Sequence, residues 1–398
     1  MNMNDRSPLL RANIRYLFVL SALGNIGFSV PIVILFQESI GLSLEEAFLI
    51  QAFFAISLVI FEIPSGYLSD RWGRKRTTVT GSAALFVGML FYCFGGGFTS
   101  FLLAEIFLAL GISFHSGTLE AITYESLAEL KEEDRYRKVN GHMGFISLSS
   151  RAIMSLIVGF IAAVNLRTPF WADLSVLAIV VIASLLLTEP ARKKMQEETH
   201  LTAIWNICTH ALIRSTVLRS LILLYTVVAA INLMLFWFLQ PFQEMVKMPL
   251  SAFGLVNALI YLGSALASKY TYLAKRWIGD RAFLFLLAII AVGSCFVLGF
   301  MTTIIGVTFF FLGETTFNAF ETLTSDLMNR ALTSDIRATV LSLRSFTSRL
   351  FFALISPMLG AAADLYSVNT ALLITGILGL VTLALTAVML RPAWRKMT

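Results

Sequence analysis

Long apolar runs follow one another along the whole chain, separated by short polar segments. A helix needs about 20 predominantly apolar residues to cross the hydrocarbon core of a bilayer. On that measure the pattern predicts an all-α membrane protein with twelve transmembrane helices. The predicted spans are residues 14–36, 44–69, 78–97, 99–127, 139–164, 169–188, 217–242, 249–274, 280–301, 303–330, 338–363 and 368–390.

The twelve predicted spans fall into two groups of six. We expect residues 1–188 to form an N-terminal six-helix bundle and residues 217–398 a C-terminal one. Residues 189–216 are polar, basic near their start and only weakly amphipathic, which predicts a cytoplasmic linker. The first apolar run is of full span length without a clear processing site, so we expect it to stay as the first membrane helix.

The two groups of six share a repeated sequence. Residues 120–127 (EAITYESL) return in weaker form as residues 321–328 (ETLTSDLM), and Gly159 and Gly360 keep the same spacing. Such a repeat predicts two pseudo-symmetric bundles in parallel orientation. Transporters built this way place their substrate site near the middle of the membrane, between the halves, and expose it alternately to the two sides.

Composition supports a membrane location. Of the 398 residues, 57% are hydrophobic and 14% are charged, and the mean hydropathy is +0.80; a soluble protein has about 25% charged residues. The net charge of +6 does not indicate nucleic-acid binding, because the cations gather in short loops between spans. Positive loops stay in the cytoplasm. Both termini are therefore predicted to be cytoplasmic, in a bacterial inner membrane.

One loop between the second and third spans has a distinctive sequence, Gly66-Tyr-Leu-Ser-Asp70-Arg-Trp-Gly73-Arg-Lys-Arg76. It resembles the loop signature of major facilitator superfamily (MFS) transporters, with matches at Gly66, Asp70, Arg71, Gly73, Arg74 and Lys75. The resemblance implies the MFS fold and a role for this loop in conformational switching. It also implies that Asp70 contacts the start of the eleventh span near 337–339. A weaker echo of the loop follows at 275–281.

Several ionisable side chains fall inside predicted spans, where a charge costs from about 2.5 to well over 10 kcal/mol. They are Glu120, Arg151, Glu314, Glu321, Arg344 and Arg349. Consecutive spans run antiparallel, so Glu120 can approach Arg151. In the same way Glu321 can approach Arg344 or Arg349. Two interpretations remain open: buried ion pairs that fix helix register, or a network that a substrate or a proton opens.

Carboxylates within the spans bear on proton coupling. Glu314, Asn318 and Glu321 share one helical face that can line a cavity. A carboxylate in a low dielectric beside an arginine can load and release a proton. Our leading hypothesis makes Glu314 or Glu321 the proton carrier, with Glu120 and Glu105 as further candidates.

Substrate binding is predicted from polar groups within the spans. Arginine binds carboxylate and phosphate groups with paired hydrogen bonds, so Arg151, Arg344 and Arg349 favour an anionic substrate. Further polar candidates are Asn25, Gln37, His115, Gln240, Asn257, Tyr261 and Asn318. A lone histidine such as His115 is also compatible with a purely structural role.

Metal, cofactor and catalytic chemistry have no sequence support. The three cysteines, Cys93, Cys208 and Cys295, lie far apart and predict packed free thiols. The chain contains no phosphate-binding loop, zinc-protease motif or nucleophile elbow. We therefore expect neither an enzyme nor a cofactor or metal.

Within the superfamily, Glu62 to Gly66 and Ser116 to Leu127 resemble a bacterial group of permeases and efflux proteins. The fifth span departs from typical drug–proton antiporters in lacking their glycine-proline signature, and Glu105 stands where many of them place an arginine. A glutamate on the fourth span with an arginine on the fifth is similar to sugar–proton symporters.

These features predict a monomeric secondary transporter in a lipid bilayer that is coupled to protons. We expect it to export a small anionic or amphiphilic compound, such as a metabolite, siderophore or drug. The alternatives are uptake of a sugar or nutrient by proton symport, a lipid translocase, and a membrane scaffold or sensor without transport.

Overall fold

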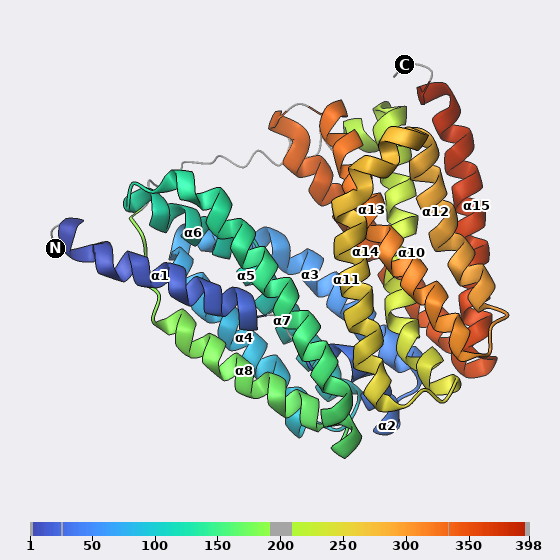
Figure 1. Ribbon diagram of the computed structural model, residues 1–398, viewed down its shortest axis with the longest axis horizontal. Coiled ribbons are helices and arrows are strands. Elements are labelled where there is room, and N and C mark those ends of the chain that lie inside the picture. The colour runs from blue at the N-terminus through green and yellow to red at the C-terminus, as the bar shows by residue number, and fades with distance from the viewer. Residues whose placement is uncertain (1–2, 25–26, 192–208, 333, 395–398) are drawn as a thin grey trace. The chain divides into compact units, whose positions relative to one another are not determined.

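The computed structural model describes residues 3–24, 27–191, 209–332 and 334–394, and within these ranges every regular element is helical. The all-α prediction is confirmed. The first part of the chain, blue to green in Figure 1, contains α1 (Met3–Leu23), η1 (Val30–Ile32), α2 (Val33–Ser39), α3 (Leu44–Trp72), α4 (Arg74–Phe94), α5 (Phe98–His115), α6 (Thr118–Glu129), η2 (Glu133–Arg135), α7 (Tyr136–Val164) and α8 (Thr168–Leu185).

The second part of the chain follows the same plan. It contains η3 (His210–Arg214), α10 (Thr216–Met245), α11 (Leu250–Ile278), α12 (Asp280–Leu298), η4 (Ile304–Gly306), α13 (Val307–Ala331), α14 (Ser334–Leu365) and α15 (Val368–Trp394). Figure 1 shows α10, α12, α13 and α15 lying side by side. The greater part of the predicted linker, residues 192–208, lies outside the described residues.

Ten stretches within the described ranges are long and apolar enough to cross a membrane. Two of the predicted spans, the first and the tenth, are not among them. The first begins with the polar α1, and the tenth corresponds to α13, which carries Glu314, Asn318 and Glu321 in its middle. Both segments are helical, so the polar residues lower their hydropathy without preventing helix formation.

The first and fourth spans each consist of two helical segments, whereas the sequence predicted one continuous run for each. The first is interrupted between Leu23 and Val30, and the fourth at Ser116 and Gly117. Gly117 has a φ of 70°, a conformation that glycine adopts without strain and that ends a helix. Short runs of glycine and polar residues mark both sites, at 24–29 and 115–118, but a count of apolar residues over a full span length does not separate the two segments.

The chain folds into two compact units. Unit 1 contains Met1–Leu42, Phe53–Gln196 and Pro249–Ala258, and unit 2 contains Ser43–Ala52, Glu197–Met248 and Leu259–Thr398. The units differ from the predicted sequence halves mainly at two short segments. The start of α3 belongs to unit 2, and the start of α11 belongs to unit 1.

Each unit has its own packed core. In unit 1 the rings of Phe36 and Phe170 lie 4.5 Å apart, and the ring of Tyr92 lies 4.9 Å from Phe170. In unit 2, Leu284 and Phe320 are completely buried in an aliphatic cluster. Close packing of this kind is sensitive to changes of a single methyl group.

The repeated glycines lie at close contacts between helices. A Cβ atom at Gly159 of α7 would lie 2.6 Å from the carbonyl oxygen of Ser251, in the first turn of α11. A Cβ atom at Gly360 of α14 would lie 2.7 Å from the carbonyl oxygen of Leu44, in the first turn of α3. The first turn of α11 therefore packs against Gly159, and the first turn of α3 packs against Gly360. This shared role explains why the two glycines recur in the sequence repeat.

Replacing Gly360 by alanine is expected to destabilise unit 2, because the added methyl group meets backbone that cannot move aside. Overpacking of this kind costs about 1–3 kcal/mol, so thermal unfolding of the purified protein should occur several degrees lower. Gly293→Ala on α12 is the control, since a Cβ there meets no described heavy atom within 4 Å. Equal unfolding temperatures for the two variants would contradict the packing argument.

Candidate functional site

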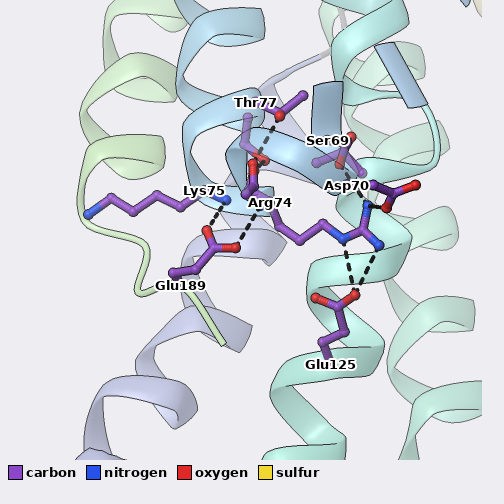
Figure 2. Close-up of polar contacts among 10 residues, drawn as sticks. Ser69, Asp70, Arg74, Lys75, Thr77, Glu125 and Glu189 are labelled. Atoms are coloured by element: carbon purple, nitrogen blue, oxygen red, sulfur yellow. Dashed lines mark hydrogen bonds and ion pairs between the residues drawn. The ribbon is translucent and has the colours of Figure 1, made fainter. Parts of the chain in front are cut away.

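The signature loop is organised around the guanidinium group of Arg74. Its Nη1 lies 2.7 Å from a carboxylate oxygen of Asp70 and donates to Ser69 Oγ at 2.8 Å, both on α3. Its Nη2 and Nε lie 3.0 Å from Glu125 Oε1 on α6 (Figure 2). Arg74 and Glu125 have side chains that are 17% and 19% exposed, whereas Asp70 is 60% exposed. The bond to Glu125 is therefore the less screened of the two.

Glu189 completes this cluster from the end of the sixth span. Its carboxylate accepts hydrogen bonds from the backbone N–H groups of Arg74 and Lys75 at 2.8 and 2.7 Å, at the start of α4 (Figure 2). Gly73, which precedes α4, has a φ of 114°, and a Cβ there would lie 2.8 Å from Glu189 Oε1. A negative charge at a helix N-terminus is favourable.

The other signature residues are more loosely placed. A Cβ atom at Gly66 would meet no described heavy atom within 4 Å. Arg71 donates to the hydroxyl of Tyr67 at 3.0 Å on the exposed side of α3. The expected contact of Asp70 with residues 337–339 stays a prediction.

Unit 2 repeats the cluster with its charges rearranged. Lys275 at the end of α11 lies 2.7 Å from Asp326 on α13 and 3.5 Å from Asp280 at the start of α12. Arg330 bonds the same two aspartates at 2.7 and 3.3 Å. Gly279, with a φ of 83°, occupies the position that Gly73 has in unit 1. The weak echo of the loop in the sequence thus corresponds to a real structural counterpart.

A second charged cluster in unit 2 joins three helices through Arg344 of α14. The guanidinium carbon lies 3.9 Å from the ring centre of Tyr225 on α10, and Nη1 donates to Ser325 Oγ on α13 at 2.9 Å. Nη2 lies 3.6 Å from Glu321 Oε1, which also accepts from the Tyr225 hydroxyl at 3.0 Å. The predicted approach of Glu321 to Arg344 is confirmed.

The exposure of this pair is uneven. The Arg344 side chain is 10% exposed and the Glu321 side chain 42% exposed. The Nε atom of Arg344 is buried and has no hydrogen-bond partner within the described residues. Guanidinium presents Nε and Nη in one plane, which is the geometry that pairs with a carboxylate. We call Tyr225, Glu321, Ser325 and Arg344 the Arg344 cluster.

Glu314 lies two helical turns before Glu321 on α13 and is 7% exposed. Its carboxylate lies near the amide of Asn232 on α10. Yet Glu314 Oε1 and Asn232 Nδ2 have no hydrogen-bond partner among the described residues. Asn318, between the two glutamates, and Arg349 are half-buried. Side-chain exposure along the predicted face of α13 therefore increases from the buried Glu314 to the half-buried Glu321.

Unit 1 contains a buried hydrogen-bonded chain. Gln37 of α2 donates to the Tyr92 hydroxyl on α4 at 3.0 Å, and that hydroxyl donates to Glu105 Oε1 on α5 at 2.5 Å. Glu105 is 6% exposed. Two of the predicted candidates, Gln37 and Glu105, are thus brought together by Tyr92, which the sequence pattern did not single out.

His115, at the end of α5, is held against α4. Its Nε2 lies 3.0 Å from Ser82 Oγ and 3.3 Å from the carbonyl oxygen of Thr78, and the side chain is 9% exposed. These contacts join neighbouring helices of unit 1, as the structural interpretation of His115 expects.

The remaining predicted residues are spread over several helices. Glu120 is exposed on α6 and Arg151 is half-buried on α7. Gln240 and Asn257 are buried, and Asn257 donates to the carbonyl oxygen of Phe253 in its own helix. Three further placements complete the set: Tyr261 is half-buried, Cys93 and Cys295 are buried free thiols, and Asn25 and Cys208 lie outside the described residues.

Sequence comparison identifies the class of protein. The family model of the Major Facilitator Superfamily matches residues 16–354. The chain belongs to this superfamily and is a multi-pass membrane transporter.

Individual relatives are more distant. The quinolone resistance protein NorA of Staphylococcus aureus is 24% identical over 191 residues. That match spans about half of each protein, 48% of this chain and 47% of NorA. The uncharacterized MFS-type transporter MJ1560 of Methanocaldococcus jannaschii is 33% identical over 89 residues, 22% of this chain and 23% of that protein.

Solved structures agree on the fold. The nucleoside transporter NupG superimposes with a TM-score of 0.74 at 13% identity, covering 98% of this chain and 100% of NupG. The D-xylose-proton symporter gives 0.69 at 15% identity, with 96% of each chain covered. At these identities the likeness shows the fold alone, and it supports the predicted twelve-helix arrangement.

The two signature glycines are expected to differ in their tolerance of a methyl group. Gly73→Ala places a side chain at a φ of 114° and against the Glu189 carboxylate, and a backbone conformation of this kind costs about 1–3 kcal/mol. Gly66→Ala meets open space in a helix and should be neutral or slightly stabilising. The check is thermal unfolding of both variants in detergent. A loss of stability in Gly66→Ala as large as that in Gly73→Ala would refute the assignment.

Proposed function

We propose that this transporter exports a small organic compound bearing a carboxylate, in exchange for protons, across a bacterial cytoplasmic membrane. Both termini lie in the cytoplasm in this proposal, and the working unit is a monomer. The observation that supports it most directly is the Arg344 cluster. A buried guanidinium with an unused Nε stands beside a glutamate that is loosely held and half exposed.

The cluster suggests a simple exchange. At 3.6 Å the contact between Arg344 Nη2 and Glu321 is longer than a charge-assisted hydrogen bond, which is typically about 2.7–2.9 Å. A substrate carboxylate can therefore replace Glu321 as the partner of Arg344, while the ring of Tyr225 supports the guanidinium from one side. Glu321 then keeps the hydroxyl of Tyr225 and is free to take a proton.

Glu314 is the second proton group in this proposal. Burial of a carboxylate without a full set of partners is costly for the charged form, which makes Glu314 a candidate for carrying a proton. Proton movement across the membrane supplies about 2.3 kcal/mol per charge for each 100 mV. The side chain of Asn232 beside Glu314 is uncharged, so this neighbour supplies no fixed positive charge to hold Glu314 in its ionised form.

Export is preferred over uptake because a partial relative is named as a quinolone resistance protein. Quinolones carry a carboxylate, which fits the chemistry of Arg344. Uptake is the second candidate, because NupG and a D-xylose-proton symporter share the fold. The direction of coupled flux separates the two.

Replacing Arg344 by lysine keeps the charge but removes the planar donor pair and its stacking on Tyr225. The half-saturation concentration for a quinolone in proteoliposomes is expected to rise about tenfold, which is the loss of roughly one charge-assisted hydrogen bond. The ester of the same quinolone should show a much smaller change. Arg276→Lys, an exposed position at the end of α11, is the control. An unchanged half-saturation concentration in Arg344→Lys would remove Arg344 from the binding site.

Proton coupling is tested by Glu314→Gln and Glu321→Gln, singly and together. A glutamine cannot release a proton, so transport driven by a pH gradient should be lost in the double variant, while exchange of labelled for unlabelled substrate continues. Glu244→Gln, at an exposed position near the end of α10, should behave as the parent. Full gradient-driven transport in the double variant would rule out both residues as carriers.

A further inference from the structure

Asp173 of α8 holds the interruption in the first span. Its Oδ1 accepts hydrogen bonds from the backbone N–H groups of Gly27 and Phe28 at 3.3 and 3.2 Å, and its Oδ2 accepts from the N–H of Ser29 at 2.8 Å. The side chain is 1% exposed. One carboxylate thus satisfies three backbone groups that no helix uses, just before η1 begins at Val30.

Two residues near Asp173 also contact α2, the helix that follows the interruption. Arg167 and Phe170 lie six and three residues before Asp173, a spacing that places all three on one side of the helix. The Arg167 guanidinium carbon lies 5.3 Å from the ring centre of Phe36 on α2, and the Phe170 ring lies 4.5 Å from the same ring. Asp173 therefore fixes the start of the second segment, and Phe170 fixes its middle.

The interruption is enclosed on its other sides as well. A Cβ atom at Gly27 would lie 2.5 Å from the sulfur of Met154 on α7. A Cβ atom at Gly24 would lie 3.8 Å from Nδ1 of His115, where α5 ends and the fourth span is interrupted. The two interruptions in unit 1 are therefore neighbours. Asp173 is the charged group that is bonded to the first of them.

We propose that Asp173 is a positioning residue for transport: it keeps the first membrane span in two segments and so fixes where the second segment, η1 with α2, lies in unit 1. Within a bilayer, backbone that is not helical persists only when its polar groups are bound by protein. Asparagine at this position has a single acceptor oxygen for three donors. The proposal extends beyond the proposed substrate and proton sites and requires only that the chain is a transporter.

The first test is hydrogen–deuterium exchange of the full-length protein in detergent. In Asp173→Asn the amides of residues 27–30 are expected to exchange about tenfold faster or more, which corresponds to the loss of at least one hydrogen bond to a charged group. Ser175→Ala is the matched control, because that hydroxyl on α8 bonds the Trp171 carbonyl of its own helix. Equal exchange at residues 27–30 in the parent and Asp173→Asn would overturn the proposal.

A second variant tests the same contact from the other side, in case Asp173→Asn does not fold. Ser29→Pro leaves Asp173 in place but removes both groups of Ser29 that bond it, the N–H and the hydroxyl. The φ of −82° at Ser29 is close to that of proline. At Gly27 and Phe28 the double variant should exchange little faster than Asp173→Asn alone, because Asp173 holds all three N–H groups and its replacement already weakens every one of these contacts. Additive effects would show that Asp173 acts through other contacts and would refute the proposal.

Transport gives the functional arm. Asp173→Asn is expected to lower the maximal rate of quinolone flux several-fold and to leave its half-saturation concentration within about twofold of the parent, since the residue positions a segment and contacts no substrate. A selective rise in half-saturation concentration would contradict this role. If the parent protein moves no quinolone, the substrate proposal fails, and the exchange measurements alone decide the role of Asp173.

Discussion

Backbone N–H groups at the start of a helix have no partner in their own helix, and the interior of a bilayer offers no water to bind them. In this protein three carboxylates from distant parts of the chain bond such N–H groups, Asp173 those within the first span and Glu189 and Asp364 those at the ends of spans. Asp173 binds the segment before η1, Glu189 binds the first turn of α4, and Asp364 of α14 binds the N–H groups of Leu44 and Glu45 at 3.0 and 2.8 Å. Each contact fixes where a helix begins, and the placement of the charged side chains on that helix follows from it.

The charged groups of the proposed transport site obey the same constraint. Arg344 is buried but supported by the ring of Tyr225 and the hydroxyl of Ser325, so its charge is tolerated without a short ion pair. Glu321 remains half exposed and loosely bound. A fully satisfied pair would only fix helix register. An incompletely satisfied pair leaves binding capacity for a ligand, and this distinction favours the switchable interpretation of the two that the sequence left open.

The sequence predicted the features that depend on long patterns. Hydropathy indicated the all-helical architecture, and the weaker echo of the signature loop at 275–281 anticipated that unit 2 would carry a counterpart of it. The meeting of Glu321 and Arg344 followed from antiparallel packing of consecutive spans. These inferences need only helix geometry and the cost of a charge in hydrocarbon.

Contacts between residues far apart in sequence were not predictable in this way. Asp173 reads as one more polar residue near a helix start, and Glu189 as part of a linker. Tyr92 and Tyr225 read as aromatic packing, although their hydroxyl groups bond Glu105 and Glu321. The interruptions of the first and fourth spans fall at short runs of glycine and polar residues that a count over a full span length passes over. Each of these depends on which helices become neighbours, and that is decided by tertiary packing.

In the proposed mechanism, protons drive a carboxylate-bearing compound out of the cell. Flux of a quinolone into everted membrane vesicles, energised to be acidic inside, tests this most directly. We predict accumulation inside these vesicles that collapses when an uncoupler dissipates the gradient. Accumulation that is insensitive to the uncoupler, or coupled entry only into right-side-out vesicles, would contradict the mechanism.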